Sequence, residues 1–201
     1  MCGIVVEGFV WCPMTTVNIL MAAMFLLPYA CWSLRRHVSH PRQPAIIVAA
    51  TPVVHPLLLG DLDDCFDDDF LSHQNVRTVF NMCGTNCSNS YACLNRHLAA
   101  KGISQFIVPM DDSAEFDLMT CFSDRKVLEF LLSSHSVGGV LVVCWGGCNR
   151  SAAVVVAYLI RFCNFQVVDA FKLCQDRRGT VLTNLSFRRQ LVQLYLSLNR
   201  A

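Results

Sequence analysis

One stretch of the chain, V-L-V-V-C-W-G-G-C-N-R-S-A-A at residues 140–153, restricts the fold more than any other. An apolar run ends at Cys144, a loop with two glycines follows, and Arg150 and Ser151 begin a second apolar run. This pattern predicts a buried strand, an anion-binding loop and a helix in direct succession. The backbone N–H groups of such a loop and the N-terminus of the helix converge on one point, with the thiol beneath them.

The remainder of the chain alternates short apolar runs with longer helical patterns. The predicted strands are 57–59, 76–82, 106–108 and 140–143, and the predicted helices are 94–101, 121–133, 152–163, 168–177 and 187–198. This alternation predicts an α/β domain with a central, mostly parallel sheet flanked by helices. A chain of 201 residues is long enough for one such domain with an appendage.

The N-terminal segment differs in character from this domain. Residues 17–34 are nearly all apolar and are followed by Arg35 and Arg36, which makes them a candidate membrane anchor with the following domain in the cytosol. Asn18 and Pro28 interrupt the run, so a helix packed on the domain is the alternative. The prolines at positions 41, 44 and 52 then favour an extended linker over residues 39–53. The expected parts are a hydrophobic segment, 1–38, a linker, 39–53, and a catalytic domain, 54–201.

Composition gives no support for a metal, a cofactor or a nucleic-acid surface. The formal net charge is +1, and the twelve cysteines lack the paired spacing of a zinc site, including the irregular group Cys83, Cys87 and Cys93. The acidic segment 60–69 lacks the glycine and the glutamate of a calcium loop, so we expect its aspartates to cap and solvate a short helix. A reactive thiolate suits a reducing compartment, which predicts a cytoplasmic chain.

Six blocks in fixed order give the chain a resemblance to a known family. They are H-P-L-L-L-G-D at 55–61, V-R-T-V-F-N-M at 76–82, V-P-M-D-D-S at 108–113, R-S-A-A-V-V-V-A-Y-L-I at 150–160, D-A-F-K-L-C-Q-D-R-R at 169–178 and T-N-L-S-F-R-R-Q-L at 183–191. Over about 54–198 the chain resembles the cysteine-dependent protein phosphatases, in particular the small dual-specificity group. The resemblance implies a protein-tyrosine-phosphatase-like fold without a cofactor, acting on phosphorylated proteins.

The resemblance also implies roles for single residues. Cys144 matches the nucleophile that forms a phosphocysteine intermediate, Arg150 matches the residue that binds two phosphate oxygens, and Ser151 matches the hydroxyl that donates to the sulfur. The backbone of the loop would complete the phosphate site, with Trp145, Gly146, Gly147, Cys148 and Asn149 as substrate-binding positions.

The general acid should be an aspartate on a separate loop. Asp112 is the chosen candidate because the family's acid directly precedes a small polar residue, and Ser113 follows here. Its neighbour Asp111 is then expected to be a solvated residue. Asn184 resembles a residue that braces the catalytic loop, and a turn residue at a helix start is the alternative.

Two residues near the thiol distinguish the chain from this pattern. The family usually carries histidine directly before the nucleophile, where this chain has Val143, and we expect less thiolate at neutral pH and a slower enzyme. Cys148 is a second thiol in the loop, and a reversible disulfide with Cys144 is open to it and to Cys83. Because the tight loop would strain the bond between Cys148 and Cys144, Cys148 is expected to act as a small residue.

Three functions fit the sequence. The leading hypothesis is a phosphatase for phosphotyrosine, with phosphoserine and phosphothreonine as further substrates. Val143 suggests a weakly active or inactive pseudophosphatase that binds phosphoproteins. Asn149, directly before Arg150, resembles RNA 5′-phosphatases, against which stand the near-neutral charge and the R-S-A-A continuation.

Overall fold

A five-stranded sheet forms the centre of the protein in the computed structural model, which describes residues 45–48, 57–84, 88–123, 126–135 and 137–199. The strands are β1 (Ala45–Val48), β2 (Leu57–Asp61), β3 (Val76–Asn81), β4 (Ser104–Ile107) and β5 (Gly139–Cys144). They lie in the order β1-β2-β5-β3-β4, and the pairs β2–β5, β5–β3 and β3–β4 are parallel. The predicted α/β fold with a mostly parallel sheet is confirmed.

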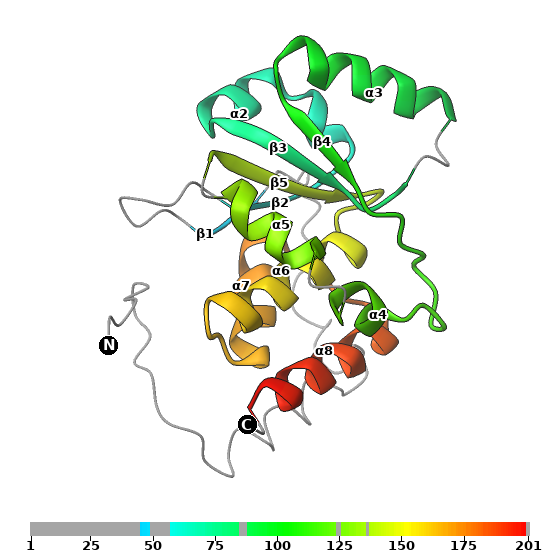
Figure 1. Ribbon diagram of the computed structural model, residues 1–201, viewed down its shortest axis with the longest axis vertical. Coiled ribbons are helices and arrows are strands. Elements are labelled where there is room, and N and C mark those ends of the chain that lie inside the picture. The colour runs from blue at the N-terminus through cyan, green and yellow to red at the C-terminus, as the bar shows by residue number, and fades with distance from the viewer. Residues whose placement is uncertain (1–44, 49–56, 85–87, 124–125, 136, 200–201) are drawn as a thin grey trace.

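Helices cover both faces of this sheet (Figure 1). They are the 3-10 helix η2 (Asp63–Phe66) and the α-helices α2 (Asp68–His73), α3 (Ser88–Ala100), α4 (Leu118–Ser123), α5 (Lys126–His135), α6 (Arg150–Phe162), α7 (Val167–Arg178) and α8 (Leu185–Leu198). The short helices η2 and α2 lie with α3 on one face, and α4 to α8 lie on the other (Figure 1). The predicted helix 121–133 is two helices, and α3 begins six residues before its predicted start.

Alternation along β5 decides which face of the sheet each side chain meets. Val140, Val142 and Cys144 belong to the larger core, which contains every residue of α6 from 152 to 160. Leu141 and Val143 belong to the smaller core on the side of α3. The thiol at the end of β5 therefore faces α6, and the side chain before it faces the opposite way.

The segment preceding β2 contributes to the sheet. The strand β1 lies within residues 39–53, where the sequence predicts an extended linker, and it pairs with β2 in the antiparallel sense. The candidate membrane anchor at 17–34 falls outside the described residues. Within the described ones, no helix combines the length and the apolar character that crossing a membrane requires.

Candidate active site

The thiol of Cys144 lies at the carboxyl end of the central strand β5, where the chain turns into α6. Its side chain is 2% exposed, and its Sγ is 3.1 Å from the Oγ of the fully buried Ser151 in the first turn of α6. At this distance the hydroxyl can donate a hydrogen bond to a thiolate, which accepts but cannot donate. The structure thus brings together the two residues to which the resemblance assigns nucleophile and sulfur partner.

The segment between β5 and α6, residues 145–149, is called here the Cys144 loop. Gly147 has φ +62°, in the left-handed region that favours glycine. A Cβ at this position would lie 2.6 Å from Nη2 of Arg178 and 2.8 Å from the carbonyl oxygen of Gly60. The loop is also tied to the segment before α8, since Leu182 N–H donates to the carbonyl oxygen of Cys148 over 2.8 Å. The backbone conformation of Gly147 and the packing around it therefore constrain the shape of this loop.

A buried ion-pair cluster packs against the Cys144 loop at Gly147. Arg178, at the end of α7, places Nη2 2.8 Å from Oδ2 of Asp61 and Nη1 3.1 Å from Oδ2 of Asp64. Burial raises the pKa of the Asp64 carboxyl to about 6, and hydrogen bonding from the Asp61 backbone together with Arg178 opposes this rise. Capping is confirmed for Asp67 at α2 and for Asp61, whose Oδ1 accepts from the N–H groups of Asp63 and Asp64 at the start of η2. The expectation of solvated aspartates is wrong for Asp64, which is buried.

This cluster could have been suspected from its residue types but not located. The available signals were an arginine at the end of a predicted helix and an excess of aspartates after β2. Asp61 and Arg178 are 117 residues apart in the sequence, so the sequence alone does not pair them. A buried carboxylate needs a partner, and only the fold shows which cation supplies it.

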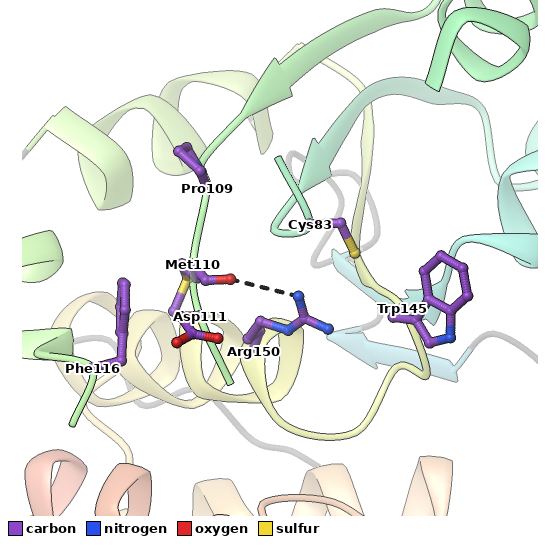
Figure 2. A pocket seen from close by; sticks show the side chains of 7 residues that line it. All are labelled: Cys83, Pro109, Met110, Asp111, Phe116, Trp145 and Arg150. Carbon is purple, nitrogen blue, oxygen red and sulfur yellow. Dashed lines mark hydrogen bonds between the residues drawn. The ribbon is translucent and has the colours of Figure 1, made fainter. Parts of the chain in front are cut away.

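A pocket of about 470 Å³ opens beside Arg150 (Figure 2). It is lined by Cys83, Pro109, Met110, Asp111, Phe116, Trp145 and Arg150. Nη1 of Arg150 donates to the carbonyl oxygen of Met110 over 3.5 Å, and its buried Nε has no hydrogen-bond partner within the described part of the chain. A buried guanidinium N–H without a partner is costly, so this site is suited to an anionic ligand.

The two neighbouring aspartates have different surroundings on the segment between β4 and α4, residues 108–117, called here the Asp112 loop. Asp111 is exposed and lines the pocket with Arg150 (Figure 2). Asp112 accepts from Nδ2 of Asn149 at 3.1 Å and from Nδ2 of Asn184 at 3.2 Å, so both of its oxygens have amide partners.

Asn184 begins a helix, as one of the two interpretations expected, and its side chain contacts the Asp112 loop rather than the Cys144 loop. Its Oδ1 accepts from the backbone N–H groups of Ser186 and Phe187, which makes it the N-cap of α8. Its Nδ2 donates to Asp112 and, over 3.0 Å, to the carbonyl oxygen of Ser113. One side chain therefore begins a helix and holds the Asp112 loop.

The other residues of the Cys144 loop have distinct environments. Trp145 is 64% exposed at the rim of the pocket, and Gly146 accepts a hydrogen bond from the Cys148 thiol over 3.1 Å. Asn149 is the N-cap residue of α6, yet its side chain makes no capping hydrogen bond. The pocket also includes Cys83, which was considered as a disulfide partner of Cys144, and Met110 and Phe116, for which the sequence analysis predicted no site role.

Known proteins resemble this chain in sequence and in fold. The family model for the catalytic domain of dual specificity phosphatases matches residues 57–196. Dual specificity protein phosphatase 2 of Mus musculus is 29% identical over 158 residues, which is 78% of this chain and 46% of that relative. The chain spans less than half the length of the curated relatives it matches.

Solved structures show the same fold. The human tyrosine phosphatase-like serine/threonine/tyrosine-interacting protein has a TM-score of 0.61 at 24% identity, covering 80% of this chain and 100% of that one. The tyrosine phosphatase OH1 from the Orf virus has a TM-score of 0.62 at 18% identity, covering 89% of this chain and 99% of that one.

Proposed function

Since the chain belongs to the dual specificity phosphatase family, we propose that it hydrolyses phosphotyrosine in proteins, and phosphoserine and phosphothreonine as well, through a phosphocysteine intermediate. The observation that carries this proposal is the buried Nε of Arg150, which has no hydrogen-bond partner among the described residues and lies at the far end of the loop that follows Cys144. A nucleophile and an anion-binding fork are thereby placed on two ends of one short loop.

The first step transfers the phosphoryl group to sulfur. The Cys144 thiolate attacks phosphorus while the bond to the leaving oxygen breaks and the general acid gives that oxygen its proton. Arg150 binds two of the phosphoryl oxygens through its planar fork, and the N–H groups of residues 145–150 surround the group. The products are the dephosphorylated hydroxyl and phosphocysteine.

The second step returns the enzyme to its starting state. The general acid, now ionised, takes a proton from water, whose oxygen attacks phosphorus as the S–P bond breaks. The leaving thiolate accepts a hydrogen bond from Ser151, whose Oγ is 3.1 Å away. This contact stabilises negative charge on sulfur, so it favours release of inorganic phosphate.

We assign the acid to Asp112, on the family pattern and on its position beside the Cys144 loop. Asp111 shares the pocket with Arg150, and we assign it a contact with the substrate next to the phosphate. The bell-shaped pH profile of kcat separates the two. The fall in kcat at high pH reports ionisation of the general acid. We expect this fall to disappear in Asp112→Asn and to stay in Asp111→Asn.

The pocket walls support aromatic phosphate esters as substrates. Pro109, Met110 and Phe116 lie on one side of Arg150 and the exposed Trp145 on the other (Figure 2). An aromatic ring bonded to the phosphate can contact these apolar surfaces, whereas a short alkyl chain buries less area. This arrangement favours phosphotyrosine over phosphoserine.

The RNA alternative gains no further support from the surroundings of Asn149. Asn149, which suggested it, has its amide engaged by Asp112, Thr183 and Asn184. A pseudophosphatase remains a separate outcome of the test, because Val143 lies at the position before the nucleophile.

The decisive experiment measures phosphate release by the full chain, wild type beside Cys144→Ser, over a broad pH range. The substrates are 4-nitrophenyl phosphate, tyrosine- and threonine-phosphorylated peptides, and 5′-triphosphorylated RNA. We expect vanadate-sensitive turnover of the ester and peptides that is absent in Cys144→Ser. Peptide binding without turnover identifies a pseudophosphatase, and release from RNA at the peptide rate identifies an RNA phosphatase.

A further inference from the structure

Asn149 links the two loops of the active site, and we propose that it is a positioning residue that holds the Asp112 carboxyl against the phosphate. This inference rests on the proposed function, since it assumes that Asp112 delivers a proton to the leaving oxygen. It assigns a task to a side chain for which the family pattern predicts only a backbone contribution.

The starting observation is an N-cap asparagine that does not cap its helix. Asparagine at this position normally accepts from an N–H of the first helical turn. Asn149 precedes α6 but makes no such bond. Its Oδ1 instead accepts from Thr183 Oγ1 at 3.1 Å and from Asn184 N–H at 3.2 Å, and its Nδ2 donates to Asp112 at 3.1 Å. The N–H groups that it leaves uncapped belong to the helix end that the phosphate would meet.

The Asp112 loop has firm support from α8. Besides the two bonds from Asn184, Ser186 Oγ donates to the carbonyl oxygen of Ala114 over 2.7 Å. Gln190 donates to the carbonyl oxygen of Phe116 over 2.8 Å and accepts from Leu118 N–H over 2.7 Å. These contacts fix the loop relative to α8, and none of them comes from the Cys144 loop itself.

Contacts from the nucleophile side are fewer among the described residues. Arg150 donates to the Met110 carbonyl over 3.5 Å, at the limit of a hydrogen bond, whereas Asn149 reaches the carboxyl of Asp112 itself at 3.1 Å. Of these two contacts, the one from Asn149 is the shorter, and it joins the loop after the proposed nucleophile directly to the proposed acid.

The amide suits this task because it serves both forms of the acid. An ionised carboxylate accepts at both oxygens, and a carboxylic acid still accepts at one while its O–H faces the leaving oxygen. A proton donor must lie within hydrogen-bond reach of that oxygen, and a displacement of about 1 Å can cost on the order of 100-fold in rate. A neutral amide at a fixed distance can hold the carboxyl in this position without adding charge.

The test separates the two halves of the Asn149 side chain. Asn149→Ala removes all three bonds. Asn149→Asp keeps an oxygen for Thr183 and Asn184 N–H but places a negative oxygen against Asp112. Asn95→Ala, at an exposed position of α3 on the opposite face of the sheet, is the matched control.

Each variant is assayed with 4-nitrophenyl phosphate and with phenyl phosphate, whose leaving group depends more on a proton. For Asn149→Ala we expect kcat/KM to fall about 10-fold or more on phenyl phosphate but about 3-fold or less on 4-nitrophenyl phosphate. Asn149→Asp should be slower still on phenyl phosphate, and Asn95→Ala should equal wild type. In an Asp112→Asn background, Asn149→Ala should cause no further selective loss.

Two failures are distinguishable. In the first, the wild type is active, but both Asn149 variants lower kcat/KM equally on the two esters, or Asn149→Asp behaves as wild type. Either result shows that Asn149 does not position the acid. Wild type no faster than Cys144→Ser on either ester shows that the proposed function is wrong, and the positioning role is then wrong with it. A thermal melt of each variant confirms that the compared proteins are folded.

Discussion

Replacing Gly147 by alanine should damage the active site through one methyl group. The new Cβ would lie 2.6 Å from Nη2 of Arg178 and 2.8 Å from the carbonyl oxygen of Gly60, both closer than Cβ contacts allow. Neither neighbour can move easily. Gly60 is backbone in the sheet, and the Arg178 side chain is 1% exposed and held by Asp61 and Asp64. The Cys144 loop must therefore shift, and the phosphate site shifts with it.

The matched control isolates this crowding from backbone strain. Gly102 has φ +67°, close to the +62° of Gly147, but a Cβ there meets nothing within 4 Å. Left-handed backbone costs alanine about 1 kcal/mol, which is about 2–4 °C in Tm for a domain of this size. Overpacking adds about 2 kcal/mol at Gly147, giving about 3 kcal/mol in all, or about 6–12 °C.

The assay combines thermal unfolding with kcat/KM on 4-nitrophenyl phosphate. Gly102→Ala should keep full activity with its small loss in Tm. Gly147→Ala should lose at least about 100-fold in kcat/KM, because a displacement near 1 Å misplaces the anion-binding groups. Equal melting temperatures for the two variants, or full activity in Gly147→Ala, would refute the reasoning that Arg178 and Gly60 confine the loop.

Three further perturbations test other parts of the structure. Val143→His places a polar ring in the smaller core, so urea unfolding should show a loss of about 1–3 kcal/mol against wild type, and an unchanged stability would contradict the assigned face of β5. The pKa of Asp64 is raised to about 6, so the folded state holds this proton more tightly than the unfolded state. The free energy of unfolding should then fall by up to about 3 kcal/mol as the pH rises from about 4 to about 6, a fall that Asp64→Asn removes; an equal slope in both proteins would exclude it. Trp145→Ala should lower kcat/KM about 3- to 10-fold on a phosphotyrosine peptide and less on an alkyl phosphate, and equal losses on both would argue against a ring contact.

The strand, loop and helix around Cys144 could be predicted because their determinants are local. The apolar run 140–143 matches β5, and the second run matches α6 to within two residues. Both are buried on all sides, so each carries a continuous apolar signal. The start of α3 was missed for the opposite reason, since the segment S-N-S-Y at its beginning offers no apolar periodicity.

What could not be predicted depends on pairs of residues far apart in the chain. The partners of Arg178 lie in β2 and just after it, and the partners of Asn149 lie in two other segments, near residues 112 and 184. The different surroundings of the adjacent Asp111 and Asp112 likewise depend on what the fold places opposite each carboxyl. Hydrogen bonds of this kind leave no periodic pattern in a sequence.

The orientation of Val143 bears on how much the missing histidine at this position can affect the Cys144 thiolate. Successive residues of β5 face opposite sides of the sheet, so the side chain of residue 143 lies in the smaller core with Val79, while the Cys144 thiol faces α6. A group that stabilises the thiolate through direct contact must therefore come from the side of α6. Ser151, 3.1 Å from the sulfur, and the N-terminal turn of α6 occupy that side. Under the proposed mechanism, Ser151→Ala should consequently slow this enzyme more than restoring the histidine at 143 accelerates it, in single-turnover measurements of phosphocysteine formation and hydrolysis.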